Sequence, residues 1–356
     1  MSSSKKVRHY KYKNIAGALA VLLLAVLALS TSCNSHKNES GKELTLQSET
    51  DNSSEVSSES NIRLTKSYKY ENLKNSEQLG KGNLVIVNKD HPFSGTVSET
   101  DGVYSYLFDK DGNQIMYASS SELSAPKEVF ASFNKLGEDF YKKTGNDSVM
   151  ISGAYSGSTE STDSSSEDVG SKAKSEENKT DLTNENAAGL GIDLRLYDAA
   201  NGTYPEFTGE GDYSWITENC GKYGFILRYP ADKSDKTGEN GNPAHFRYVG
   251  VPFAEIMTQN SLTLEEFMDF VKQYTFENPM EFESEDEKNY LIYYVSAEKG
   301  DTTNVPIPQK SDGSEYTYTL SGNNIDGYII CINSDEDTEE EPVSDNSEIS
   351  QKSEAE

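Results

Sequence analysis

Three long stretches of this chain contain almost no side chains that could be buried, and they limit how much of it can fold. Residues 34–66, 157–186 and 334–356 consist mostly of Ser, Glu, Asp, Asn, Thr and Lys. Such segments bury too little apolar surface to offset the entropy lost on folding. From 356 residues we therefore expect one core of moderate size, interrupted by an exposed loop over residues 157–186.

The charge of the chain excludes one class of partner. The net charge is -28 at pH 7, with 60 acidic against 32 basic residues. A surface of this sign repels phosphate backbones, so we expect no nucleic-acid partner. The acidic run in residues 334–356 predicts a solvated, disordered tail, with calcium or partner binding as the alternative.

The N-terminus resembles an export signal. Five basic residues precede an apolar run over residues 15–29, which is shorter than the roughly 20 residues of a full membrane span. Cys33 follows Ser30-Thr31-Ser32, at the place where bacterial lipoproteins are cleaved and acylated, although a larger aliphatic residue is usual at position 30. We expect residues 1–32 to be a signal or anchor and residues 33–66 a disordered linker. Lipid attachment at Cys33, an uncleaved anchor helix and free secretion all stay open, and tethering would place the chain on the extracytoplasmic face of a bacterial membrane.

Residues 67–275 show the alternation of elements expected of an α+β domain. Helical spacing predicts a helix over residues 126–143, capped by Ser124 and stopped by Gly145. A second helix over 215–223 and a third from Thr263, with Glu266 completing a capping box, follow. Strands are expected at 84–87, 149–153, 192–196, 224–229 and 245–249.

Period-two alternation between residues 192 and 196 divides one strand into two faces. Ile192, Leu194 and Leu196 form a packing face, while Asp193 and Arg195 form a polar face that is available for other contacts. The later segments 290–295, 316–320 and 328–332 predict a small β appendage over residues 276–333. Cys220 and Cys331 fall in apolar elements, so two buried free thiols are the favoured interpretation, although export permits a disulfide.

Several motifs resemble the VanY-type D-alanyl-D-alanine carboxypeptidases. The resemblance rests on Tyr223-Gly-Phe-Ile-Leu-Arg-Tyr-Pro230, Thr237-Gly238, Pro243-Ala-His-Phe-Arg-Tyr-Val-Gly250 and Leu262-Thr-Leu-Glu-Glu-Phe267, and upstream on Val85-Ile-Val-Asn-Lys-Asp-His-Pro92, Ile151-Ser-Gly153 and Gly189-Leu-Gly-Ile-Asp193. Together they cover most of residues 80 to 275 in order. The resemblance implies a small antiparallel sheet flanked by helices and a zinc peptidase of peptidoglycan.

The same resemblance implies five site positions, of which two keep the family's residue type. Asp193 and His245 stand where the second and third zinc ligands belong, but the first ligand position is Asn186. The catalytic base position is Asn242, and the arginine that holds the substrate carboxylate is replaced by Tyr155. A further serine of the motif is retained as Ser156. The candidate ligand contacts are Tyr155, Ser156 and Arg247.

These replacements favour a protein that no longer cleaves. An amide is a weak zinc ligand, so Asn186 should weaken metal binding. An amide also has no useful basicity, so Asn242 could not deprotonate a water molecule. Glu185 or Glu239 could replace a lost group if a loop slipped, but ligand positions tolerate only about 0.2 Å of displacement. Without a metal, Asp193 would pair with Arg195, Arg247 or His245.

Three functions therefore stay open. The leading hypothesis is a catalytically silent family member that binds peptidoglycan stem peptides or acts as a scaffold, with no cofactor expected. The alternative is an active zinc D-Ala-D-Ala carboxypeptidase that uses Asp193, His245 and a third ligand. The last is a surface-interaction protein in which the appendage and the acidic tail carry the function.

Overall fold

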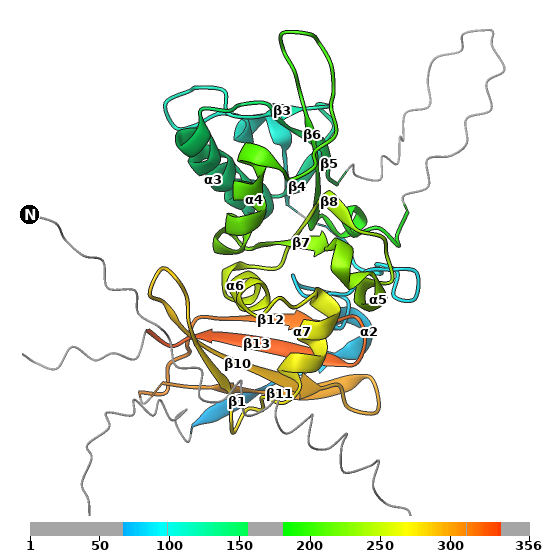
Figure 1. Ribbon diagram of the computed structural model, residues 1–356. Coiled ribbons are helices and arrows are strands. Elements are labelled where there is room, and N and C mark those ends of the chain that lie inside the picture. Colours follow the sequence, from blue (N-terminus) through cyan, green and yellow to red (C-terminus); the bar gives the residue numbers. More distant parts are fainter. Residues whose placement is uncertain (1–66, 98, 156–180, 311, 336–356) are drawn as a thin grey trace, which may run out of the picture. The chain divides into compact units, whose positions relative to one another are not determined.

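The computed structural model describes residues 67–97, 99–155, 181–310 and 312–335, which belong to one compact unit (Figure 1). The expected signal, Cys33, the linker, most of the 157–186 loop and residues 336–356 lie outside the described residues. Within the described ranges, no helix combines the length and apolarity needed to cross a bilayer.

A five-stranded sheet forms the frame on which the candidate site is built. Its order is β3-β5-β6-β8-β7, and only the β3–β5 pair is parallel. The strands are β3 (Tyr117–Ala118), β5 (Val149–Gly153), β6 (Gly191–Leu196), β8 (Asn242–Tyr248) and β7 (Phe225–Tyr229). The α+β class and the small, largely antiparallel sheet are confirmed.

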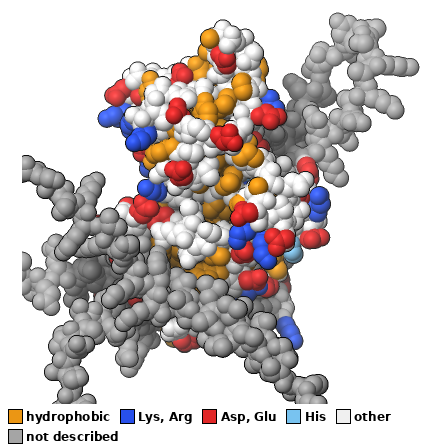
Figure 2. Space-filling view, viewed as in Figure 1, with side chains coloured by type: hydrophobic (Ala, Val, Ile, Leu, Met, Phe, Trp, Pro, Cys, Tyr) orange, Lys and Arg blue, Asp and Glu red, His pale blue; other side chains and the backbone are white. Residues whose placement is uncertain are grey.

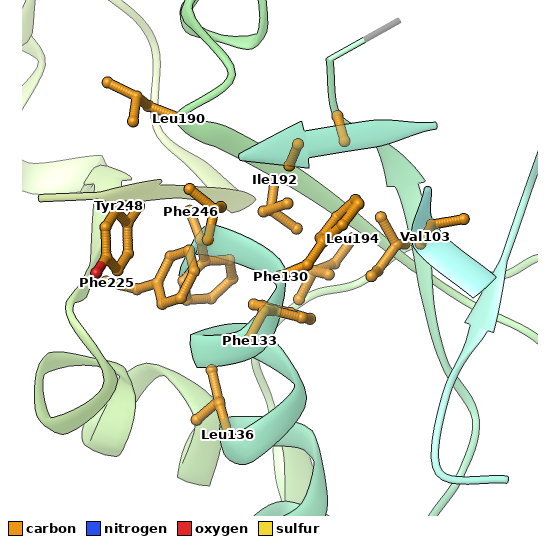
Figure 3. Close-up of a cluster of buried hydrophobic side chains, with 14 of the residues drawn as sticks. Val103, Phe130, Phe133, Leu136, Leu190, Ile192, Leu194, Phe225, Phe246 and Tyr248 are labelled. Carbon is orange, nitrogen blue, oxygen red and sulfur yellow. The ribbon is translucent and has the colours of Figure 1, made fainter. Parts of the chain in front are cut away.

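One face of this sheet is covered by α3 (Lys127–Thr144), as Figure 3 shows. Phe130, Phe133 and Leu136 point from the helix toward Ile192 and Leu194, and all five side chains are buried. Burying such side chains removes apolar surface from water at roughly 25 cal/mol per Å². Because alternate residues of β6 enter this core, Asp193 and Arg195 must lie on the opposite face.

Helix α3 ends where the sequence predicted, but the residue expected to cap its start does not do so. Gly145 adopts the left-handed conformation with φ 71° and its N–H bonds to Tyr141 O, so the predicted stop is confirmed. Ser124 does not cap the helix. It lies in β4 (Ser124–Pro126), which pairs with β2 (Thr100–Gly102), and its hydroxyl bonds to Tyr155 O instead.

Shorter helices connect the strands. They are α2 (Asn75–Gln78), α4 (Ser214–Asn219), α5 (Ser234–Thr237), α6 (Val251–Gln259) and α7 (Leu264–Val271), with 3-10 turns at η1 (Val103–Tyr106), η2 (Glu185–Ala188), η3 (Gly211–Tyr213), η4 (Cys220–Tyr223) and η5 (Ala231–Lys233). The predicted helix at 215–223 is therefore α4 continued by η4. The capping box between Thr263 and Glu266 at the start of α7 is confirmed.

A second, four-stranded sheet of order β12-β13-β10-β9 follows α7. Its strands are β9 (Met280–Glu283), β10 (Asn289–Ser296), β12 (Tyr318–Gly322) and β13 (Gly327–Asn333). Beside it, β11 (Thr302–Pro308) pairs with β1 (Tyr68–Lys74). Strand β1 thus lies at the start of the expected domain range 67–275, in a segment for which no strand was expected.

The expected strand at 84–87 is wrong. Leu84 and Val87 are fully buried, but the segment has no strand partner. Its N–H groups bond across to the second sheet instead, Leu84 to Ser321 Oγ and Ile86 to Asn323 O. An apolar run indicates burial whether or not it joins a ladder, so it could not distinguish a strand from a buried connecting segment.

The two described cysteines confirm the expectation of free, buried thiols. Cys220 packs in the core between α3 and the first sheet, whereas Cys331 packs with α6 and α7. The surface around these cores carries interspersed acidic and basic side chains on the face seen in Figure 2. No continuous basic patch is visible among the described residues on that face.

Candidate functional site

Antiparallel pairing of β6 and β8 brings the two retained ligand positions together. Asp193 and His245 are direct cross-strand partners. His245 Nδ1 lies 2.6 Å from Asp193 Oδ1, a hydrogen bond between the two groups expected to hold zinc. Asp193 therefore pairs with His245, one of the three partners considered from the sequence. Within the described ranges it forms no ion pair with Arg195 or Arg247.

A tight turn holds Asn186 against the same carboxylate. The Asn184 side chain accepts from the Asn186 N–H at the start of η2, and Gly189 ends the turn with φ 74°. Asn186 Nδ2 then donates to Asp193 Oδ2 at 2.7 Å. Packing here is close enough that a Cβ at Gly191 would collide with Asn186 Oδ1, and one at Gly153 with Asp193. The turn and the sheet thus hold the Asn186 amide against the Asp193 carboxylate.

Glu185 turns inward and joins a buried group of charges. Its Oε1 accepts from Arg228 Nε at 2.7 Å and from Arg247 Nη1 at 2.6 Å, with all three side chains nearly inaccessible to solvent. Its Oε2 lies 3.5 Å from His245 Nε2. Arg228 is also held by Glu265 on α7, at 2.9 and 2.5 Å. We call Glu185, Asp193, His245, Arg228, Arg247 and Glu265 the buried charge cluster.

The cluster shifts the ionisation of its members. Burial lowers the pKa of His245, but hydrogen bonds to Asp193 and Glu185 outweigh it and raise the pKa to about 9. Burial raises the pKa of Glu185, and the guanidinium groups of Arg228 and Arg247 outweigh it and hold the pKa well below its usual range. Burial likewise raises the pKa of Asp193, but the hydrogen bond and charge of His245, together with the hydrogen bond from Asn186, outweigh it and lower the pKa. At neutral pH three carboxylates therefore face two guanidinium groups and one imidazolium.

The other sequence-predicted positions lie apart from this cluster. Asn242, at the base position, is exposed at the start of β8, and its Oδ1 accepts the Ala244 N–H. Glu239 is exposed and pairs with Lys89 at 3.3 Å, so only Glu185 of the two proposed replacements turns toward His245. Tyr155 is half-buried, and its carbonyl oxygen accepts from Ser124. Ser156 lies outside the described residues.

Among the predicted site residues, Arg247 has the surroundings that differ most from the prediction. The sequence suggested that it contacts a ligand, but the structure buries it completely. Besides Glu185, its guanidinium donates to Asn83 O at 3.1 Å, Val85 O at 2.8 Å and Tyr248 O at 3.1 Å. These four acceptors occupy the guanidinium and tie β8 to the 83–85 segment. Its contacts are those of a structural residue.

Sequence reasoning missed Arg228 and Glu265 altogether. Arg228 lies within the apolar strand β7, and a charge in such a run implies a buried partner. That signal was present in the sequence, but it does not identify the partner. Glu265 lies 37 positions further along the chain, on α7.

The donors present do not fit a catalytic zinc, which takes three protein ligands and a water. Asp193 and His245 are hydrogen-bonded to each other, and the third position offers the amide of Asn186. In Glu185, the nearest further carboxylate, Oε1 is engaged by two arginines, whereas Oε2, like Asn186 Oδ1 and His245 Nε2, is buried without a hydrogen-bond partner in the described chain. Across the described ranges, no group of three His, Cys, Asp or Glu side chains is arranged to hold a metal ion.

Comparison with known proteins identifies the family. The family model described as D-alanyl-D-alanine carboxypeptidase, VanY, matches residues 133–251. A D-alanyl-D-alanine carboxypeptidase of Enterococcus faecium is 31% identical over 72% of this chain and 77% of its own length. The putative carboxypeptidase YodJ of Bacillus subtilis (strain 168) is 29% identical over 57% of this chain and 71% of its own.

Solved structures agree with these sequence matches. The vancomycin-resistance D,D-dipeptidase VanXYg, solved with a D-Ala-D-Ala phosphinate analogue, superposes with a TM-score of 0.56 and 28% identity. That match covers 75% of this chain and 99% of the other, so it includes strands beyond the first sheet. On these matches, the chain belongs to the VanY family of D-alanyl-D-alanine carboxypeptidases.

Proposed function

We propose that this chain is a non-hydrolysing member of its family that binds peptidoglycan stem peptides in the cell envelope. One observation carries the proposal. The side chains at the three ligand positions are hydrogen-bonded to one another, in the chain Asn186–Asp193–His245. A hydrolytic centre needs those donors directed at a metal, with an open position for water.

The base position supports the same proposal. A water attacking a peptide carbonyl needs an acceptor for its proton, and the amide of Asn242 has no basicity in the neutral range. Losing a positioned base typically lowers the rate by about 10²–10⁴-fold. The remaining cleft can still orient a peptide through its polar strand face without breaking a bond.

The test combines two measurements on the purified chain from residue 67 onward. We expect far less than one zinc per chain by inductively coupled plasma mass spectrometry. We also expect no release of D-alanine from a stem pentapeptide ending in D-Ala-D-Ala, while the intact peptide binds in a calorimetric titration. Zinc near one equivalent together with D-alanine release would overturn the proposal.

An active zinc carboxypeptidase is the second candidate, favoured by the approach of Glu185 to His245 at 3.5 Å. In that case Asp193, His245 and Glu185 would supply the ligands. Both guanidiniums hold Glu185 Oε1, which leaves the buried Oε2 without a hydrogen-bond partner in the described chain and available as a ligand. His245→Ala would then abolish turnover, whereas a non-hydrolysing protein has no turnover to lose.

Attachment to the extracytoplasmic face of a bacterial membrane is part of the proposal. It is supported by the basic residues, the apolar run over residues 15–29 and Cys33. Membrane fractionation of cells expressing the full chain or Cys33→Ala tests it. Release of the variant into the soluble fraction indicates lipid attachment, and retention of both indicates an anchor helix.

A further inference from the structure

Arg195 stands apart from the other arginines that the structure describes. Arg228 and Arg247 are buried and bound to carboxylates, whereas Arg195 is exposed and forms no ion pair within the described ranges. Its side chain donates a hydrogen bond from Nη1 to Tyr204 O at 3.3 Å. Four of its five N–H donors thus remain available to a ligand. In a chain of net charge -28, a guanidinium without a carboxylate partner is unusual.

A cavity of about 440 Å³ opens beside this guanidinium. It is lined by Ala118, Ser119, Met150, Ser152, Arg195 and Tyr204. The register of β5 against β6 shifts between Ile151 and Gly153, so Ser152 sits at a β-bulge. Bulges next to functional sites commonly redirect a side chain. Ser119 Oγ bonds to Ser152 O at 3.2 Å, which brings the two serines together on one wall.

A row of aromatic rings supports Tyr204, which also lines the cavity. The ring of Tyr204 stacks on that of Tyr197 with centroids 5.4 Å apart, and Tyr197 meets Tyr117 edge-on at 4.7 Å. Such ring pairs restrict the motion of their members. The lining of the cavity therefore combines the Arg195 cation, two serines and the ring of Tyr204. Ala118 and Met150 add apolar surface.

The position of the cavity links it to the family site. Arg195 lies two residues after Asp193 on β6, so both side chains project from the same face of the sheet. The two residues are about 7 Å apart along the strand. A peptide whose last carboxylate met Arg195 would extend its preceding residues toward Asp193 and His245.

We infer that Arg195, with Ser119 and Ser152, forms a carboxylate-binding subsite for the C-terminal end of a peptide. A guanidinium matches the planar geometry of a carboxylate and can hold it with two N–H bonds. The cavity of about 440 Å³ is partly apolar and has room for a terminal residue such as alanine beside the guanidinium. The inference deepens the proposed function and rests on it, because Tyr155 leaves the expected carboxylate position without a cation.

Glu206 is a nearby carboxylate that competes with such a ligand. Its backbone bridges that of Arg195, which places the two side chains on the same side of the sheet. No ion pair joins them in the part of the chain that the structure describes. Removing this charge should therefore strengthen binding of an anion at Arg195.

The experiment compares diacetyl-L-Lys-D-Ala-D-Ala with its C-terminal amide in calorimetric titrations. We expect the acid to bind at least tenfold more tightly than the amide. Arg195→Gln should abolish this preference, and Arg195→Lys should retain part of it. Glu206→Gln should increase the affinity for the acid several-fold. Lys299→Gln, which removes an exposed cation from the β10–β11 connection, is the matched control and should change nothing.

The outcomes separate this inference from the proposed function. Equal affinity for acid and amide, or an unchanged preference in Arg195→Gln, overturns the carboxylate subsite. Release of D-alanine during the titration overturns the non-hydrolysing function but leaves the subsite standing if the acid preference depends on Arg195. Circular dichroism melts of each variant, expected to match the wild type because Arg195 is exposed, exclude unfolding as the cause.

Discussion

Glu185 is the residue whose replacement tests the buried charge cluster most directly. It is the carboxylate that Arg228 and Arg247 share, and it also faces His245. Glu185→Gln keeps the shape of the side chain and removes only its charge. Arg228 would keep its two bonds to Glu265, whereas Arg247 would be left with carbonyl oxygens alone.

The expected loss in the free energy of unfolding of Glu185→Gln follows from this difference between Arg228 and Arg247. Removing one partner of a buried ion pair costs about 3–5 kcal/mol, because a buried charge loses its compensation. Since Arg247 keeps three carbonyl acceptors, we expect the lower end, about 3 kcal/mol. For a folded region of this size that corresponds to a fall in Tm of roughly 6–12 °C.

The assay is thermal and urea unfolding followed by circular dichroism, in buffer containing EDTA so that adventitious metal has no effect. Glu265→Gln is the matched control. It also removes a carboxylate from Arg228, but its side chain is 22% exposed and Arg228 retains Glu185. We expect a loss of about 1–2 kcal/mol there. Equal losses in the two variants would refute the argument that Glu185 is the shared, central carboxylate.

Two further predictions concern the ligand position and the thiols. Asn186→His supplies an imidazole at the first ligand position, so it should raise the zinc content toward one equivalent by mass spectrometry, and an unchanged content would contradict the family alignment at this position. Burial raises the pKa of both the Cys220 and the Cys331 thiols to about 12, so neither should react with Ellman's reagent at pH 8 until urea unfolds the chain. Rapid reaction of a native Cys33→Ala variant, in which these are the two remaining thiols, would contradict their burial.

The elements that position the site were largely predictable from local patterns. Alternation in 192–196 identified β6 and its two faces, and helical spacing with Gly145 identified α3 and its end. Thr263 and Glu266 marked the start of α7. Each of these signals depends on residues within a few positions of one another, where propensity and capping act.

The contacts that were not predictable join residues far apart in the chain. Strand β1 pairs with β11 across more than two hundred positions, and neither segment carries a local sign of the other. The same holds for Glu185, whose partners Arg228 and Arg247 come from two different strands. A sequence shows that a buried charge needs compensation, but the fold decides which carboxylate provides it.

The buried charge cluster explains how the family fold can persist while its ligand positions change. Arg228 and Arg247 tie β7 and β8 to the turn that carries Glu185, and none of these bonds requires a metal. At the other end of the cluster, the Asn186 amide donates to Asp193, which an alanine there could not do. Asp193, whose side chain is 32% exposed, would then keep only its bond to His245 within the described chain, and the lost hydrogen bond costs about 0.5–1.5 kcal/mol. The Asn186 amide therefore supports the Asp193 carboxylate through a hydrogen bond that needs no metal.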